Sequence, residues 1–326
     1  MIMNPIGIIA GSGIREFLDN AERKKIKTDY GTVEADFGKL AGCDVVFLNR
    51  HGSKERFPSK LHPRESADHA NRRFAGHRFQ LLGNACSHDK RLPKANDVPK
   101  LQCSFEDTVC DFVANACSNF GIPNLHGKFA CAPHKINFQA NIAALKKCRV
   151  GRIIGISSVG IINMSMEKII VVNDFFDHTK ETRTFYDKPV HVDMSKPYCP
   201  ELNGLILKSC RKLGVKASEG AYVCVSGPRL ETPKEIEIFG KLGCDVVGMT
   251  SVPEAILARE LEMCYSTIAI GTNYAAGLQE KLAADEIIAG VEKYVGGVKA
   301  ILRDALPEIP EKRGCVCSRA LSGAKL

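Results

Sequence analysis

The sequence predicts an α/β protein whose sheet is covered by helices on both faces. Over residues 132–306, short apolar runs typical of buried strands alternate with helical stretches; the runs are RIIGI, KIIVV, AYVCV, DVVGM and CYSTIAI. Near the N-terminus, IGIIA and DVVFL give two further strand signals, each followed by polar loop residues. The pattern favours an open sheet. With 326 residues and 44% hydrophobic content, the chain can bury a full core as one large domain or as two smaller ones.

Two helices carry clear terminal signals. Thr232, Pro233 and Glu235 form a capping-box sequence with proline at the first helical position, and Gly243 ends the same helix. Residues 284–306 place apolar side chains at helical spacing, which predicts a long amphipathic helix near the C-terminus.

The segment 53–131 interrupts this alternation. It is rich in His, Arg and Pro, shows little periodicity before a short helical piece, SFEDTVCDFVANACSNFG, and carries much of the formal net charge of +8. Elsewhere no basic face interleaved with aromatic residues appears, so a nucleic-acid partner is not expected.

The fourteen cysteines predict thiols rather than a disulfide scaffold. Most lie in apolar runs, as Cys224 and Cys264 do, and are expected to be buried. Cys315 and Cys317, in RGCVCSR, are expected to be exposed; a redox role is conceivable, but two idle thiols are favoured. Three further cysteines, at 103, 110 and 117, recur every seven residues and lie too far apart along a helix to close around one metal. No metal site is predicted.

No apolar run is long enough to span a bilayer, and the N-terminus leads directly into a strand without a secretion signal. We therefore expect a cytoplasmic protein with no membrane partner.

Four loops rich in small or polar residues each follow a predicted strand. They are AGSG at 10–13, NRHG at 49–52, SSVG at 157–160 and GMTSVPE at 248–254. In α/β sheets the ligand site lies beyond the carboxyl ends of the strands, where such loops converge. A cation such as Arg50 at a strand end is costly unless an anion compensates its desolvation, so a phosphate site is predicted, with a structural salt bridge as the alternative. Gly11-Ser12-Gly13 is equally typical of a tight turn.

Seven motifs in collinear order resemble one known family. IIAGSGI, FLNRHG, PHKINFQANIAALK, ISSVG, GPRLET, GMTSVPEAILARE and TNYAAG are similar to the methylthioadenosine/methylthioinosine phosphorylase branch of the trimeric purine nucleoside phosphorylases. The resemblance covers residues 5–52 and 132 to about 306. It implies a three-layer α/β sandwich with a central mixed sheet, and phosphorolysis of a purine nucleoside to free base and (methylthio)ribose 1-phosphate. It also implies inorganic phosphate as co-substrate, no metal or organic cofactor, and a homotrimer or hexamer.

The resemblance also assigns site residues. Those that it places at the phosphate are Ser12, Arg50, His51, Ser157, Ser158 and Thr250. Those that it places at the sugar and base are Met249, Leu230, Ala275, Glu231 and Asn273.

Asn273 and Glu231 are predicted to select the base. Relatives that take adenine nucleosides typically show T-D-Y-D where this chain has Thr272-Asn273-Tyr274-Ala275. A 6-oxopurine presents an acceptor at O6 and a donor at N1, which an amide and a carboxylate complement. Adenine reverses both polarities and would not fit this pair. Phosphorolysis of methylthioadenosine is the alternative function. Another alternative is that Asn273 merely satisfies its own turn and Glu231 merely precedes a helix.

The 5′ substituent is predicted to be methylthio. Phosphorylases of unmodified ribosides often bond the 5′-hydroxyl with a histidine beyond the base-binding Asn, whereas no histidine here follows His191. Leu278, Leu282 and Ile287 make that region apolar. The preferred substrate is therefore S-methyl-5′-thioinosine, with inosine and guanosine as further substrates.

The predicted organisation is one phosphorylase domain, residues 1–52 and 132–306, an atypical and loosely packed insertion, residues 53–131, and a tail, residues 307–326. The insertion could be a lid or surface subdomain, an arm that binds a partner or nucleic acid, or a non-native segment such as a translated intron. A catalytically silent protein that binds through the insertion is therefore a second hypothesis.

Overall fold

The computed structural model describes residues 4–11, 18–52, 133–280 and 284–324. These residues all belong to one compact unit. The predicted insertion, with its helical piece and its cysteines, lies outside the described residues, as does Ser12.

A nine-stranded mixed sheet forms the centre of the described chain, in the order β2-β3-β4-β1-β5-β8-β7-β6-β9. β5 pairs with β1, β8 and β9, so the sheet closes on itself between β5 and β9 and the expectation of an open sheet is wrong there. The predicted strands are all present. The bounds are β1 Ile6–Ala10, β2 Asp19–Thr28, β3 Gly31–Leu40, β4 Cys43–Asn49, β5 Arg152–Ile161, β6 Ile169–Asp177, β7 Ala217–Cys224, β8 Val246–Gly248 and β9 Cys264–Tyr274.

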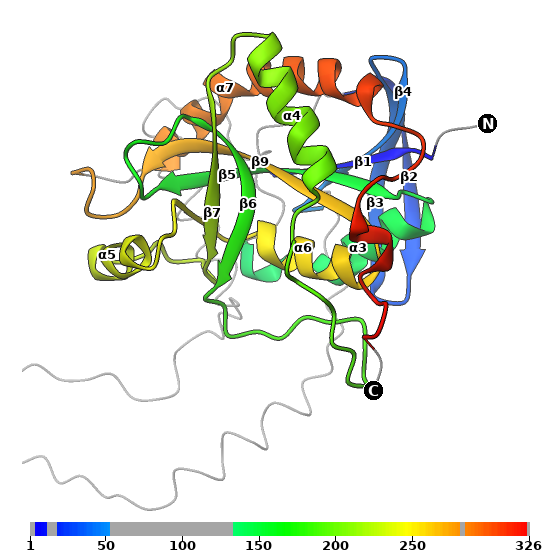
Figure 1. Cartoon of the computed structure of the whole chain (residues 1–326), viewed down its shortest axis with the longest axis horizontal. Coiled ribbons are helices and arrows are strands. Elements are labelled where there is room, and N and C mark those ends of the chain that lie inside the picture. Colours follow the sequence, from blue (N-terminus) through cyan, green and yellow to red (C-terminus); the bar gives the residue numbers. More distant parts are fainter. Residues whose placement is uncertain (1–3, 12–17, 53–132, 281–283, 325–326) are drawn as a thin grey trace, which may run out of the picture. The chain divides into compact units, whose positions relative to one another are not determined.

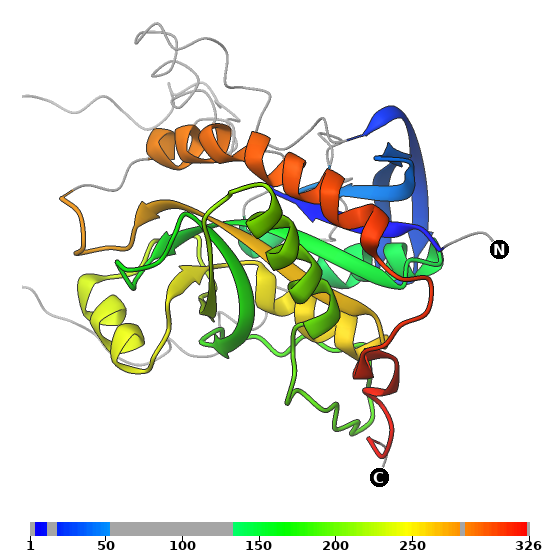
Figure 2. The same cartoon turned by 45° about the horizontal axis from the view of Figure 1, so that its top comes forward.

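Helices cover both faces of the sheet and make the predicted three layers (Figures 1 and 2). Helices α3 (Phe138–Lys147) and α6 (Ser251–Glu260) pack on one face, and α4 (Pro200–Lys212) and α7 (Ala284–Ala305) pack on the other. Successive residues of a strand point to opposite faces, so Ile9 belongs to the core under α3 and α6 while Ile8 belongs to the core under α4 and α7.

Helix α5 (Pro233–Lys241) begins at the predicted capping box. The Glu235 backbone N–H donates to Thr232 Oγ1 at 3.2 Å, and the Glu235 carboxylate accepts from the Thr232 N–H at 2.8 Å. Gly243 follows the helix with φ +82°, a left-handed conformation that glycine adopts without strain. α7 also matches its predicted extent closely.

The β2–β3 hairpin was not predicted. β2 is almost wholly exposed, with Ile26 its one buried residue, so it lacks the apolar alternation that marks a half-buried strand.

The C-terminal tail packs on the core beyond α7. It contains two short 3₁₀ turns, Leu306–Glu308 and Val316–Arg319, and buries Ile309, Ala320 and Ala324. Cys317 is 1% exposed, so the prediction that it is exposed is wrong, whereas Cys224 and Cys264 are buried as predicted. None of the described helices is long and apolar enough to cross a membrane.

Candidate active site

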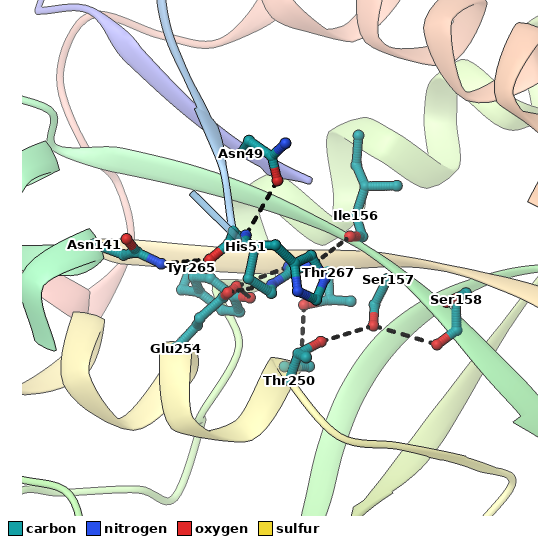
Figure 3. Close-up of polar contacts among 12 residues, drawn as sticks. Asn49, His51, Asn141, Ile156, Ser157, Ser158, Thr250, Glu254, Tyr265 and Thr267 are labelled. Atoms are coloured by element: carbon teal, nitrogen blue, oxygen red, sulfur yellow. Dashed lines mark hydrogen bonds and ion pairs between the residues drawn. The ribbon is translucent and has the colours of Figure 1, made fainter. Parts of the chain in front are cut away.

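The ends of β1 and β4 meet beside the middle of β5, where the sequence places its phosphate-binding loops. SSVG lies within β5, so the prediction of a loop at 157–160 is wrong. Ala10, the last residue of β1, is in register with Asn49 of β4 and Ile156 of β5. The Arg50 backbone N–H donates to the Ala10 carbonyl at 2.8 Å. Figure 3 shows that the start of α6 reaches the same place, with Thr250 beside Ser157.

Arg50 is buried and holds three of these segments together. Its guanidinium makes a two-pronged ion pair with Glu254 of α6, with Nη2 3.0 Å from Oε2 and Nε on Oε1, and Nη1 donates to the Ile156 carbonyl at 3.0 Å. Burial disfavours the charge, but the Glu254 carboxylate outweighs it and raises the pKa of Arg50 above its ordinary value. The predicted structural salt bridge is therefore present. A guanidinium has five N–H donors and these contacts use three, so within the described residues one N–H on Nη1 and one on Nη2 have no acceptor.

Glu254 is a site residue that the sequence analysis missed. It lies in the first turn of α6, is completely buried, and also accepts from the Tyr265 hydroxyl at 2.6 Å. A carboxylate at a helix N-terminus is favoured by the helix dipole. The sequence did contain a signal for Glu254: it is the glutamate of GMTSVPE, a segment already predicted to bind phosphate.

Ser157 and Thr250 bring two hydroxyls together at the start of α6. Their Oγ atoms lie 3.1 Å apart, and both residues are buried. Thr250 is the N-cap of α6 but makes no side-chain cap hydrogen bond, and its N–H donates to the Tyr222 hydroxyl at 3.2 Å. Hydroxyls and a helix N-terminus form a set of donors that suits phosphate. Ser158, next along β5, is exposed.

His51 and Gly11 complete this site among the described residues. The His51 N–H donates to Asn49 Oδ1 at 3.1 Å (Figure 3). A Cβ at Gly11 would lie 3.4 Å from Arg50 Nη1 and 3.5 Å from His51 Nε2, so Gly11 lies close to both side chains.

Asn273, near the end of β9, has an amide whose orientation is fixed by its neighbours. Nδ2 donates to the Tyr274 carbonyl at 2.9 Å, and Oδ1 accepts from Thr272 Oγ1 at 2.8 Å. Since a carbonyl can only accept, the nitrogen must face Tyr274. The alternative hypothesis, that Asn273 satisfies its own turn, requires these two bonds, and both are present. Within the described residues the second Nδ2–H has no acceptor.

Glu231 lies just before α5, and burial raises the pKa of its carboxyl above the ordinary value. A Cβ at Gly277, where φ is +83°, would lie 2.7 Å from Pro233 Cβ, so the start of α5 packs on the segment that follows β9. This packing carries Glu231 to the end of the sheet where Asn273 lies. Both residues are described, and no hydrogen bond joins their side chains.

The predicted sugar-binding residues have different surroundings. Met249 Sδ lies over Gly227, where a Cβ would come within 2.5 Å of it. Leu230 is 43% exposed, whereas Ala275 is 1% exposed and packs in the cluster that contains Ile236 of α5.

Two cavities of the described residues lie away from these loops. One of about 250 Å³ is lined by Gly151, Arg152 and Ile309, and one of about 370 Å³ is lined by Tyr198 and Asn203 among others. The candidate site is therefore defined by its converging side chains rather than by either cavity.

Comparison with known proteins identifies the family. The family model described as "Phosphorylase superfamily" matches residues 124–307. The chain belongs to the phosphorylase superfamily. It is 34% identical over 331 residues to a probable S-methyl-5′-thioinosine phosphorylase of Methanopyrus kandleri, covering 99% of this chain and all of that protein. It is 42% identical over 326 residues to a probable 6-oxopurine nucleoside phosphorylase of Moorella thermoacetica, covering 97% of each.

A solved structure supports the phosphorylase fold. A methylthioadenosine phosphorylase sourced from an Antarctic soil metagenomic library superposes with a TM-score of 0.70 and 23% identity, covering 100% of this chain and 93% of that one. The family and fold class predicted from the motifs are thereby confirmed. Arg50, Ser157 and Thr250 thus gather polar groups where β1 and β4 end beside β5, while Asn273 lies near the end of β9 and Glu231 precedes α5.

Proposed function

We propose that this protein is a purine nucleoside phosphorylase that cleaves 6-oxopurine nucleosides, with S-methyl-5′-thioinosine as its preferred substrate. The observation that carries the choice of base is the Asn273 amide, whose nitrogen is held as a donor by the Tyr274 carbonyl. Its remaining N–H would bond O6, and the Glu231 carboxylate would accept from N1–H. Adenine would put an amine against the Nδ2 donor and an unprotonated ring nitrogen against the carboxylate.

In the proposed reaction, a phosphate oxygen forms a bond to C1′ as the C1′–N9 bond breaks. The electron pair of that bond leaves with the purine, which then takes a proton from solvent. Positive charge on the sugar is stabilised by the phosphate, and negative charge on the base by the Asn273 donor. Ser157, Thr250, His51, Ser158 and the free N–H groups of Arg50 would orient the phosphate, together with Ser12.

Assembly and location extend this proposal. Ile238 and Leu242, 47% and 61% exposed, lie four residues apart along the chain at the end of α5 and offer apolar surface for a subunit contact. A contact of this kind would be needed in the homotrimer or hexamer expected from the family resemblance. The cysteines of the described residues are free thiols, which suits a reducing cytoplasm.

The test is to incubate the purified full-length protein with methylthioinosine, inosine or methylthioadenosine, with and without phosphate. Phosphate-dependent release of hypoxanthine, fastest from methylthioinosine, is the expected result. Preferential release of adenine would establish the methylthioadenosine alternative. Release without phosphate would indicate a hydrolytic nucleosidase, and no release would favour a catalytically silent protein.

A further inference from the structure

Four cysteines from separate parts of the chain meet at the opposite end of β9 from Asn273. They are Cys199, the N-cap of α4; Cys264, the first residue of β9; and Cys315 and Cys317 in the tail. Their Sγ atoms all lie within 4.8 Å of one another; three of the residues are buried and Cys315 is half-buried. This grouping was not predicted, because Cys199, Cys264 and the Cys315/Cys317 pair come together only in the folded chain.

Backbone hydrogen bonds fix the segments that carry these cysteines. The Cys199 N–H donates to the Tyr265 carbonyl at 2.7 Å, which joins the start of α4 to β9. The Cys264 N–H donates to the Gly151 carbonyl at 3.0 Å. The Gly314 N–H donates to Glu201 Oε1, in the first turn of α4, at 3.0 Å, which seats the tail just before Cys315.

The spacing of the sulfurs suits a tetrahedral metal better than disulfides. Zn–S bonds of about 2.3 Å place the sulfurs of a tetrahedral site about 3.8 Å apart. Cys264 Sγ and Cys315 Sγ lie 3.3 Å apart, well beyond the roughly 2.05 Å of a disulfide bond. Four thiolates without water as a ligand are typical of structural zinc.

The surroundings compensate the charge of such a site. Four thiolates and one Zn²⁺ carry a net charge of about −2, by the charges of the ligand set. Cys199 caps the thirteen-residue helix α4 without a side-chain cap hydrogen bond, so its sulfur lies at the positive end of the helix dipole. Arg313, two residues before Cys315, donates to the Glu262 carbonyl at 2.7 Å and brings a cation to this end of the molecule.

We infer that Cys199, Cys264, Cys315 and Cys317 form a structural zinc site that fastens the C-terminal tail to α4 and β9. The zinc site lies far from the proposed base-binding end, because Cys264 and Asn273 are nine residues apart on an extended strand, or about 30 Å. Its role is to stabilise the fold by adding metal–ligand bonds to the apolar contacts that already hold the tail. The expectation from sequence that the chain binds no metal would then be wrong.

The experiment measures zinc and thiols in the full-length protein purified with a phosphine reductant and without chelator. About one zinc per chain is expected, lost in Cys315→Ser/Cys317→Ser and in Cys199→Ser. The half-buried Cys148, outside the cluster, supplies the control, and Cys148→Ser should keep the metal. Because a variant can lose metal by misfolding, Co²⁺ is also exchanged into the unmodified protein. The visible bands of a tetrahedral tetrathiolate cobalt site are expected.

Absence of both bound zinc and that cobalt spectrum, with all four thiols free to alkylation, would overturn the proposal. Disulfides linking these cysteines in a parallel preparation made without reductant or chelator would overturn it equally. Retention of full metal content in Cys315→Ser/Cys317→Ser would do so as well, because the site would then lie elsewhere.

Discussion

The Arg50 guanidinium at the end of β4 and the Glu254 carboxylate in the first turn of α6 form a buried, two-pronged ion pair across 204 positions of sequence. Arg50 also bonds the Ile156 carbonyl, and Glu254 also bonds the Tyr265 hydroxyl. The pair therefore connects β4, β5, β9 and α6 at the candidate phosphate site. Under the proposed function Arg50 has two tasks: it stabilises the fold, and its remaining N–H groups would bind the phosphate.

Removing either member of this pair should destabilise the protein strongly. Arg50→Ala or Glu254→Ala leaves an uncompensated buried charge and should cost about 3–5 kcal/mol of unfolding free energy. Urea denaturation measures this cost. The double replacement Arg50→Met/Glu254→Leu removes both charges and should cost clearly less than the sum of the two single changes. Additive losses would show that the two side chains are not coupled.

Arg50→Lys tests the phosphate role with less damage to the pair. Lysine keeps the charge but lacks the planar guanidinium. Its single ammonium group cannot donate to Glu254, the Ile156 carbonyl and a phosphate at the same time. The KM for phosphate should rise about tenfold, equivalent to ~1.4 kcal/mol, with little change in the KM for the nucleoside. Steady-state kinetics with phosphate varied gives the answer. Arg152→Lys, at the opposite end of β5, should leave both constants unchanged. An unaltered phosphate KM in Arg50→Lys would restrict Arg50 to a structural role.

Asn273→Asp should move base preference from 6-oxopurines towards 6-aminopurines. The substitution replaces a donor with an acceptor at the position that would bond O6. It also sets a carboxylate oxygen against the Tyr274 carbonyl, which Nδ2 now bonds at 2.9 Å. The ratio of kcat/KM for methylthioinosine to that for methylthioadenosine should fall at least tenfold, or by ~1.4 kcal/mol.

The matched control for that change is Asn137→Asp at the N-cap of α3, where aspartate caps about as well as asparagine. Its preference between the two substrates should be that of the unmodified protein. If the unmodified protein already prefers methylthioadenosine, base selection by Asn273 is refuted.

The acid side of the pH profile should report Glu231. Burial raises the pKa of this carboxyl, and the carboxylate is the form that accepts from N1–H. As pH falls through the raised pKa the carboxylate is protonated, so kcat/KM for a 6-oxopurine nucleoside should fall at a pH above the ordinary Glu pKa of about 4.3. Protonation of phosphate also lowers kcat/KM on the acid side of the profile. The pH profile of the unmodified protein is therefore compared with that of Glu231→Gln. The Glu231→Gln variant has no carboxyl at this position, so its kcat/KM should fall less between neutral and acid pH. Identical profiles would remove Glu231 from base recognition.

Local sequence signals were sufficient for much of the fold. The apolar runs of β1 and β4–β9 mark buried strands because their side chains leave water on both faces of the sheet. The capping box at Thr232 and Glu235 marked the start of α5, since both partners lie within one turn. The loops after β1 and β4 were recognisable because these two strands are parallel neighbours and bring their carboxyl ends together.

The sequence by itself determined the family, most elements and the residue types that suit phosphate and a 6-oxopurine. Tertiary structure decided which groups meet: Glu254 as partner of Arg50, β9 closing against β5, and the four sulfurs around the tail. A helix cap or an amphipathic helix involves residues that are close together in the sequence. Such features can therefore be recognised from residue spacing alone. Contacts between residues 50 and 254, or 199 and 317, depend on how the layers pack, and the burial that makes them strong exists only after folding.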